Sequence, residues 1–498
     1  MATPIPANTA AFTIAEIVAA TRGAVARPGP AQELPAIGVS SDSRSVPKRG
    51  IFVALKGEAH DGHAYLASAC ERGIAVAIVE RGRAAAVSGP AAADVTFVEV
   101  DDTLVALGDL ARAHLEAWRA ATPQHKVVAI TGSAGKTTTK ELAAALFGAV
   151  GRTHFTAGNL NNRVGVPFVV LGIRSDHRFA VLEMGMSLPG ELDAITSFAR
   201  PDVSVVTNVG VAHAEGVGGP DGVMHEKGAV YRALDGSGVA IVNADDDRAT
   251  RASQGTRAKN VVTFGTREGA MYRLVSREPL GGAGSRVALS TPGRQLSLVL
   301  PLPGEAAAID LAAALAAQET ASGVLLPAET IESELATVRL AGRATVRHLA
   351  EDIILLDDTY NANPGSMRAA LETLAEIAVA GVGVERRRVA ILGEMKELGA
   401  HAEPEHVALG DAIAAAGVTL AIGCGGLISR ALARAAELGV TCVDAASTEL
   451  AAAEAKARVR PSDAVLVKGS RSVGAERVVA VLIETWPGAE KSATSGSA

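Results

Sequence analysis

A glycine-rich segment in the first third of the chain has the composition of a phosphate-binding loop. It follows the apolar run Val127–Ile130 and reads Thr131-Gly132-Ser133-Ala134-Gly135-Lys136-Thr137-Thr138. Glycines let backbone N–H groups close around phosphate oxygens, and the N-terminus of a following helix adds positive potential. A strict Walker A loop has glycine five positions before Gly135, where this chain has Ile130, so the loop is a shortened variant. A turn with a chance lysine is the alternative, but the strand before the loop and the three consecutive threonines favour a nucleotide site.

The residue types of this loop define its expected chemistry. Lys136 would reach the β- and γ-phosphates, and the Thr137 hydroxyl would ligate Mg²⁺. The remaining contacts to the nucleotide would come from the rest of the loop, namely Gly132, Ser133, Ala134, Gly135 and Thr138.

Polar residues also follow several apolar runs downstream. Glu183 comes after Phe179–Leu182, where a carboxylate at a strand end is either a metal ligand or a loop residue facing water. Asparagine amides bind phosphates and carbonyls without adding charge, although a plain polar turn has the same composition; the chain has such a cluster at Asn159, Asn161 and Asn162. Taken alone, His213 is an ordinary polar histidine, and Lys227 is a solvated helix lysine in a charged run.

The elements that would position these residues follow an α/β pattern in three units. Dividing 498 residues by about 150 per domain already predicts roughly three domains. We expect a small α/β domain at residues 1–100 and a central domain at 101–341. A Rossmann-like domain should follow at 342–488, and a disordered tail at 489–498.

Individual elements can be placed within these units. Buried strands are expected at 50–55 and 74–79 with a helix at 65–72 between them, and an amphipathic helix at 103–121. The central domain should contain a mostly parallel sheet with strands at 127–130, 179–182, 203–206 and 239–242, and a helix from about 138. Residues 270–300 alternate more strongly and predict an antiparallel excursion. Strands of the third unit are expected at 353–356, 389–392, 420–422 and 464–467.

Composition excludes several classes of protein. Hydrophobic residues make up 48% of the chain, which is enough for several cores. A net charge of −7 and an aromatic content of 3% argue against a nucleic-acid partner, which would need a basic face or stacking rings. The three cysteines lack zinc-site spacing, and we identify neither a signal peptide nor a membrane span. We therefore expect a cytoplasmic protein.

The motifs together resemble the Mur ligase family, whose members build the peptide of peptidoglycan. The loop is similar to that family's ATP loop, and residues 156–167 are similar to its G-N-x-N-N-x-x-G-x-P motif. Glu183-Met184-Gly185 fits its E-x-G motif, and residues 208–213 fit N-x-x-x-x-H. Three further stretches are most similar to the member of the family that adds D-alanyl-D-alanine, and they are residues 41–63, 357–367 and 392–399. The D-N-P-R motif of the diaminopimelate-adding member is absent from the third unit.

The resemblance implies roles for specific residues. The catalytic set would be Lys136, His213, Lys227 and Arg343. Magnesium would be bound by Thr137, Glu183, His213 and a carbamate formed on Lys227. Arg343, Asp358 and Asn361 would add contacts to ATP. The other substrates would contact Ser43, Arg44, Lys56, Asn159, Asn161, Asn162, Lys468 and Ser470. Lys468 and Ser470 belong to a basic strand–helix turn for which a purely structural role is equally open, and Asn363-Pro364 also fits a helix N-cap followed by an N1 proline.

The resemblance also implies a reaction. The chain would be an ATP- and Mg²⁺-dependent amide ligase that joins UDP-N-acetylmuramoyl-tripeptide to D-alanyl-D-alanine through an acyl phosphate, and we expect it to act as a monomer. A diaminopimelate- or lysine-adding ligase, or a folylpolyglutamate synthetase, is the main alternative. A P-loop regulatory protein without ligase activity is the second.

One segment departs from the family pattern. Where the family has G-x-H-N-x-x-N before an alanine-rich helix, this chain reads Gly304-Glu305-Ala306-Ala307-Ala308-Ile309-Asp310. Alanines replace the expected histidine and asparagine, and Asp310 stands at the place of the later asparagine. We expect altered contacts to the nucleoside, with the phosphate and metal positions unaffected.

Overall fold

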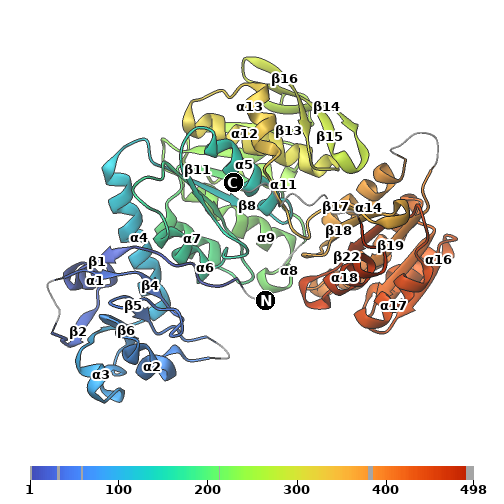
Figure 1. Ribbon diagram of the computed structural model, residues 1–498. Helices are drawn as coiled ribbons and strands as arrows, with labels where there is room; N and C mark the ends of the chain where they lie inside the picture. The colour runs from blue at the N-terminus through green and yellow to red at the C-terminus, as the bar shows by residue number, and fades with distance from the viewer. Residues whose placement is uncertain (1–2, 31–33, 58–59, 212–213, 380–384, 489–498) are drawn as a thin grey trace, which may run out of the picture.

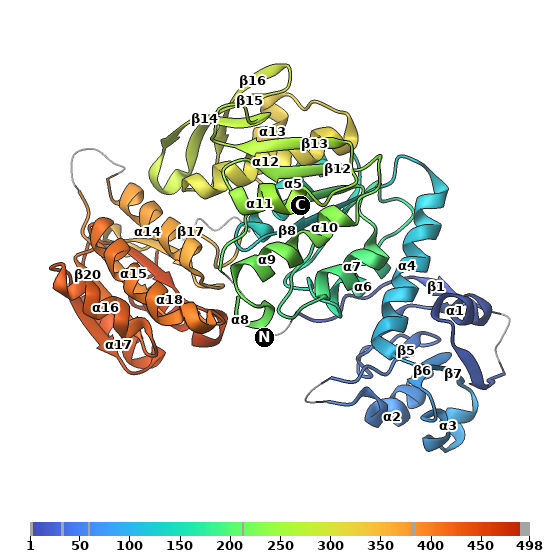
Figure 2. The ribbon, with the colours of Figure 1, turned by 180° about the vertical axis from the view of Figure 1, so that it is seen from behind.

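Three β-sheet units follow one another along the chain, and the first and third lie on opposite sides of the second (Figures 1 and 2). The computed structural model describes residues 3–30, 34–57, 60–211, 214–379 and 385–488. Within these ranges, no helix combines the length and the apolar character needed to cross a bilayer.

The N-terminal unit contains a five-stranded sheet in the order β2-β7-β6-β5-β4. Its strands are β2 (Ala24–Arg27), β4 (Val39–Ser40), β5 (Ile51–Val53), β6 (Val76–Glu80) and β7 (Thr96–Val100). A separate pair joins β1 (Ala11–Phe12) to β3 (Ala36–Ile37), and the helices are α1 (Ile14–Thr21), α2 (Leu66–Glu71) and α3 (Pro90–Ala93). The two strands expected here are confirmed, although β5 is shorter than predicted because the chain turns at Leu55, whose carbonyl accepts from Gly62. The sequence patterns missed β2, β4 and β7.

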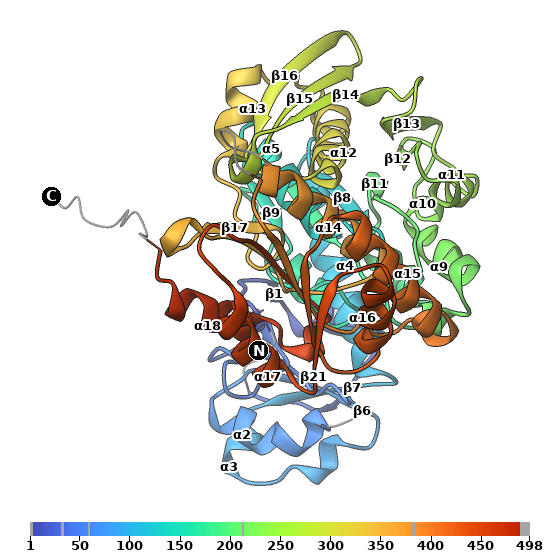
Figure 3. The same cartoon turned by 90° about the vertical axis from the view of Figure 1, so that its right-hand side faces the viewer.

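A nine-stranded sheet forms the central unit, in the order β16-β15-β14-β13-β12-β11-β8-β10-β9. Its parallel strands are β8 (Lys126–Thr131), β9 (Thr153–Phe155), β10 (Phe179–Glu183), β11 (Val203–Val206), β12 (Val239–Asn243) and β13 (Asn260–Gly265). The antiparallel excursion is confirmed, because β14 (Tyr272–Pro279), β15 (Ser285–Thr291) and β16 (Arg294–Leu300) pair antiparallel to one another. It rises at the end of the unit farthest from the N-terminal unit (Figure 3).

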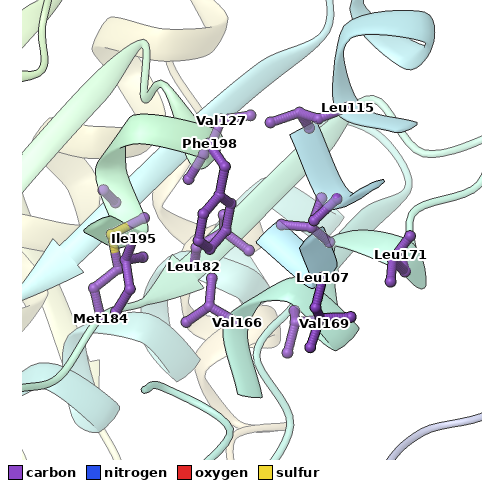
Figure 4. Packing of buried hydrophobic residues seen from close by; sticks show 14 of the residues in the cluster. Leu107, Leu115, Val127, Val166, Val169, Leu171, Leu182, Met184, Ile195 and Phe198 are labelled. Carbon is purple, nitrogen blue, oxygen red and sulfur yellow. The ribbon is translucent and has the colours of Figure 1, made fainter. Parts of the chain in front are cut away.

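Helices cover both faces of the central sheet. One face packs on α4 (Thr103–Ala121), α6 (Gly165–Leu171) and α7 (Glu191–Ala199). Figure 4 shows Leu182 and Val127 of the sheet among Leu107 of α4, Val166 of α6 and Phe198 of α7. The other face packs on α5 (Lys136–Gly148), α12 (Glu305–Ser322) and α13 (Ala328–Leu335). Burial on both faces explains why these strands are nearly continuous apolar runs.

The C-terminal unit has a six-stranded sheet in the order β17-β18-β22-β19-β20-β21. Its strands are β17 (Thr345–His348), β18 (Ile354–Asp358), β19 (Arg388–Leu392), β20 (Leu420–Cys424), β21 (Thr441–Ala445) and β22 (Ala464–Lys468). All are parallel except β17, and the flanking helices are α14 (Pro364–Val379), α15 (Ala402–Ala415), α16 (Ile428–Glu437), α17 (Thr448–Arg458) and α18 (Glu476–Thr485). The predicted Rossmann-like pattern is confirmed, with β17 and β21 as additions.

Side chains dock the C-terminal unit on the central one. Arg277 of β14 forms a bidentate ion pair with Glu376 of α14, with one N···O distance of 2.9 Å. Asn363 donates from its amide to the Ser133 carbonyl of the phosphate loop at 3.1 Å. The two units therefore meet across the predicted nucleotide loop.

Candidate active site

The strand order places a cleft at the carboxyl ends of β8, β10 and β11. The connections leaving β8 and β11 run in opposite directions across the sheet, and such a switch point is where open α/β sheets bind ligands. The cleft has a volume of about 1090 Å³, and residues of the C-terminal unit line its far side. Most of the predicted site residues line it together, namely Ser133–Thr138, Asn159, Asn161, Asn162, Glu183, Lys227, Arg343, Asp358, Asn361 and Lys468.

The phosphate loop connects β8 to α5, which begins at Lys136, two residues earlier than predicted. Gly135 has φ +80° and is tightly enclosed, because a Cβ there would lie 2.5 Å from Asp310 Oδ1. Glycine is therefore required at this position on two grounds, its backbone conformation and the space around it. The Lys136 ammonium donates to the Gly132 carbonyl at 2.6 Å, so it folds back over the loop.

Asn208, which follows β11, supports the loop from the neighbouring strand. Its side-chain oxygen accepts from the Ala134 N–H at 2.9 Å, and its backbone carbonyl accepts from the Ser133 N–H at 3.0 Å. The Ser133 hydroxyl in turn accepts from the Gly210 N–H at 2.8 Å. These bonds fix the conformation of the loop, which lowers the cost of ordering it when phosphate binds. The sequence motif at residues 208–213 contains Asn208 but does not predict this supporting role.

Glu183 is the last residue of β10 and is only 1% exposed, so its interpretation as a loop residue facing water is wrong. Its Oε2 accepts from the Thr137 hydroxyl at 2.8 Å, and its Oε1 accepts from the Asn161 amide at 2.8 Å. The carboxylate is thus held beside the threonine that we predicted to bind magnesium.

Lys227 ends α9 (Pro220–Lys227) and is 1% exposed, so it is not a solvated helix lysine. No residue within the described ranges forms a hydrogen bond or ion pair with its ammonium. Burial lowers the pKa of Lys227 well below its usual value, and the nearby Lys136 adds to this shift while Glu226 opposes it. Burial of this kind favours the neutral amine of a lysine.

These groups are chemically suited to Mg²⁺ bound together with a nucleotide. Magnesium prefers oxygen ligands and commonly takes only one or two protein carboxylates, with phosphates and water completing its octahedron. Accordingly, no three His, Cys, Asp or Glu side chains converge as a ready-made metal site in the part of the chain that the structure describes. Thr137, Glu183 and an oxygen-bearing derivative of Lys227 would fit such a partial set. His213 lies outside the described residues.

Two arginines contact the Tyr360 ring at the opposite wall of the cleft. The Arg343 guanidinium carbon lies 3.8 Å from the ring centroid and that of Arg471 lies 5.6 Å from it. Stacking holds the planar guanidinium while its N–H groups stay available for an anion. Burial lowers the pKa of Lys136, and the charge of Arg343 lowers it further. The two positive charges therefore lie close enough to interact. No local sequence pattern predicted this role of Tyr360.

Lys468, at the end of β22, is buried, and its ammonium already has protein partners. Its ammonium lies 2.5 Å from Asp358 Oδ2 and 2.9 Å from the Asn361 carbonyl. These contacts favour a role in holding the segment 358–361 against the cleft. Asn363 is a true N-cap, because its side-chain oxygen accepts from the Ser366 N–H at 2.9 Å.

Family models match each of the three units. The model described as Mur ligase family, catalytic domain, matches residues 36–115, the Mur ligase middle domain matches 130–318, and the Mur ligase glutamate ligase domain matches 342–471. The chain belongs to the Mur ligase family. The resemblance inferred from its motifs and the three-domain α/β fold are thereby confirmed.

Individual Mur ligases align over nearly the whole chain. The UDP-N-acetylmuramoyl-tripeptide–D-alanyl-D-alanine ligase of Escherichia coli is 36% identical over 90% of this chain and 93% of its own. A crystal structure of MurF from Acinetobacter baumannii superposes with a TM-score of 0.81 at 32% identity, covering 96% of this chain and all of that one. The MurF ligase of Thermotoga maritima, solved in complex with ADP, has a TM-score of 0.75 at 27% identity, covering 90% and 97%.

Several predicted residues lie away from the Mur ligase cleft. Ser43, Arg44 and Lys56 belong to the N-terminal unit and do not line it, and Arg44 pairs with Asp42 at 2.9 Å. Ser470 is 3% exposed and accepts from the Lys396 N–H at 2.9 Å, which gives it a structural contact instead. Gly132 is buried behind the loop, where its carbonyl accepts from Lys136.

The segment that departs from the Mur ligase pattern forms the start of α12. Ala306, Ala307 and Asp310 all line the cleft. The two alanines offer no side-chain hydrogen bond, whereas Asp310 is buried beside Gly135 and accepts from the Thr139 hydroxyl at 3.1 Å. Burial raises the pKa of Asp310 to about 8. At neutral pH its neutral carboxyl therefore resembles the asparagine that the family pattern places here.

Proposed function

We propose that this protein is an ATP-dependent ligase that joins UDP-N-acetylmuramoyl-tripeptide to D-alanyl-D-alanine in peptidoglycan synthesis. The observation that carries the proposal is the convergence of Lys136, Glu183, Lys227 and Arg343 on one cleft between two units. The E. coli relative and both solved relatives carry the name of this ligase. We further propose that it acts in the cytoplasm, where its nucleotide substrates are made, and the expectation of a monomer stays a prediction.

In the first step, an oxygen of the tripeptide carboxylate attacks the γ-phosphorus of ATP. The bond between the γ-phosphorus and the bridging oxygen breaks, so ADP leaves and an acyl phosphate forms. Lys136 and Arg343 face this reaction from opposite walls of the cleft, and their charges stabilise the phosphoryl group as negative charge builds on its oxygens.

In the second step, the amine of D-alanyl-D-alanine attacks the acyl carbon. A C–N bond forms, the C–O bond to phosphate breaks, and the amine loses a proton. The acyl phosphate would hydrolyse in open water, so the contacts that hold the C-terminal unit on the cleft, such as Asn363 to Ser133, protect it.

We assign Thr137 and Glu183 to a magnesium ion that accompanies the nucleotide, with His213 as a predicted further ligand. When bound, such an ion neutralises phosphate charge and orients the reacting oxygens. We also propose that Lys227 carries a carbamate: its amine nitrogen attacks CO₂, a C–N bond forms, and the nitrogen releases a proton. Its lowered pKa supports this reaction, because only the neutral amine is a nucleophile.

The arrangement of the units also indicates which residues contact each substrate. Asn159 and Asn162 line the cleft on the side of α6, and we assign them with Asn161 to the sugar–peptide substrate. Ser43, Arg44 and Lys56 would then contact the uridine end in the N-terminal unit. Asp358 and Asn361, held by Lys468, would contact the nucleotide from the C-terminal unit.

A coupled assay with the purified full chain tests the proposed function. ADP and phosphate should form only when UDP-N-acetylmuramoyl-tripeptide, ATP and D-alanyl-D-alanine are all present, and the Lys136→Met variant should lose this activity. Turnover with diaminopimelate but not with D-alanyl-D-alanine would instead identify a different ligase of the fold. Nucleotide binding without substrate-stimulated ADP formation would identify a regulatory protein.

A further inference from the structure

A second lysine of the phosphate-loop helix is buried next to the carboxylate that we assign to magnesium. Lys140 lies one turn after Lys136 on α5 and is 0% exposed. Its ammonium is 3.9 Å from Glu183 Oε2. Lys140 does not line the cleft, so it cannot touch a nucleotide there and would have to act through another residue.

Hydrogen bonds connect Lys140 to Glu183 through Thr156. The Lys140 ammonium donates to the Thr156 carbonyl at 2.8 Å. The Thr156 hydroxyl accepts from the Glu183 backbone N–H at 2.9 Å, and Thr156 is itself fully buried. The lysine is therefore linked through Thr156 to the backbone that carries the carboxylate, and its charge lies 3.9 Å from the carboxylate oxygen.

A purely structural role explains this lysine poorly. Burying an ammonium costs several kcal/mol, and an apolar side chain of similar volume is often as stable at such a position. Its other ion pair, to Glu141 at 2.7 Å, involves a carboxylate that is a quarter exposed and would not require full burial of the lysine. Glu183 differs from Glu141, because its carboxylate at the cleft wall is only 1% exposed and a buried carboxylate is stabilised by a cation beside it.

We propose that Lys140 is a positioning residue that holds the Glu183 carboxylate in its metal-binding orientation. Thr137 and Asn161 donate to this carboxylate from the cleft side, and Lys140 approaches it from the interior. The inference rests on the assignment of Glu183 to magnesium under the proposed function. It adds a residue that touches neither metal nor substrate but controls the geometry of the ligand.

The test measures magnesium and nucleotide binding separately in the full chain. Mg²⁺ is titrated into protein with a non-hydrolysable ATP analogue, and binding of the analogue is also measured in EDTA. Loss of residues that orient a metal ligand typically weakens metal binding tenfold or more, so Lys140→Met should lower the apparent Mg²⁺ affinity by about tenfold. Binding of the analogue in EDTA should not change. Lys140→Arg, which keeps the charge, should restore most of the Mg²⁺ affinity.

Glu141→Gln is the matched control. It removes the other ion pair of Lys140 and leaves the contacts to Thr156 and Glu183 in place, so Mg²⁺ affinity should stay at the wild-type value. If Lys140→Met does not fold, Lys140→Gln removes the charge and keeps a donor for the Thr156 carbonyl, and the same loss of Mg²⁺ affinity is expected.

Two results would overturn the inference. Wild-type Mg²⁺ affinity in the uncharged variants would show that Glu183 does not depend on Lys140. An equal loss of analogue binding with Mg²⁺ and in EDTA would show that Lys140 supports the phosphate loop as a whole. Neither readout uses the sugar–peptide or D-alanyl-D-alanine, so a failure of the proposed function in the coupled assay would be distinguishable from a failure here.

Discussion

The Arg343 guanidinium stacks on the Tyr360 ring, with its central carbon 3.8 Å from the ring centroid. The two residues come from different segments of the C-terminal unit, before β17 and after β18. The tyrosine thereby acts as a platform that aims a cation into the cleft opposite Lys136.

Removing this platform should impair the use of ATP. Stacking of a cation on a ring contributes about 1 kcal/mol, so Tyr360→Leu should lower kcat/KM for ATP about fivefold, while Tyr360→Phe should stay near wild type. Steady-state kinetics measure this effect. In an Arg343→Ala background Tyr360→Leu should have little further effect, and fully additive losses would show that the ring does not act through Arg343.

Asp310 should make the stability of the protein depend on pH. Its pKa is about 8 in the folded chain and 3.8 in the unfolded one, so between these values the folded state binds the additional proton. The resulting contribution of Asp310 to the free energy of unfolding is present in full below pH 4. It is lost as pH rises towards 8, by up to about 1.4 kcal/mol per pH unit.

The Asp310→Asn variant tests this dependence. It keeps the shape of the side chain without the charge, so its Tm advantage over wild type should grow from pH 5 to pH 8 and then level off. Thermal unfolding at several pH values measures the advantage. Asp247→Asn, at an exposed surface carboxylate paired with Arg267, is the control and should show no such trend. A constant difference across this range would contradict the assignment.

His154 should make the protein sensitive to acid. Burial lowers its pKa to about 4, and its Nε2 lies 2.7 Å from the Val169 carbonyl, to which it donates in the neutral form. Between pH 6.5 and pH 4, His154 is protonated in the unfolded chain but neutral in the folded chain. Stability is therefore full above pH 6.5 and falls by up to about 3 kcal/mol as pH decreases to 4.

Urea unfolding at pH 7 and pH 5 measures this loss. His154→Gln keeps an amide donor for the carbonyl and removes the titration, so it should reduce the difference in stability between the two pH values. His401→Gln, at an exposed histidine, should leave that difference unchanged. The prediction fails if both variants behave alike.

The ion pair between Arg277 and Glu376 should hold the C-terminal unit in its docked position. Arg277 has only 9% of its side chain exposed, so removing its partner leaves a mostly buried charge. Glu376→Ala should therefore increase the radius of gyration measured by small-angle X-ray scattering and raise the KM for ATP. The exchanged pair Arg277→Glu with Glu376→Arg should recover part of both values, and an unchanged scattering profile in Glu376→Ala would refute the proposed role.

Local sequence patterns predicted much of the fold. Continuous apolar runs predicted the parallel strands because those strands are buried on both faces, and alternation at residues 270–300 predicted the antiparallel ones. These patterns did not predict the short strands β2 and β4 or the edge strands β17 and β21. They are brief or half-exposed, and pairing with a neighbouring strand defines them more than composition does.

The sequence by itself determined the phosphate loop and the identity of the polar residues after each strand, because those signals lie within a few neighbouring positions. Only the tertiary structure decided which charges are buried. The local sequence around Lys227 does not distinguish a solvent-exposed lysine from a buried one, yet this residue is 1% exposed in the folded chain. The pairing of Lys140 with Glu183 and of Arg277 with Glu376 joins residues far apart in the chain. Desolvation and long-range contact depend on how the units pack, and no local pattern records them.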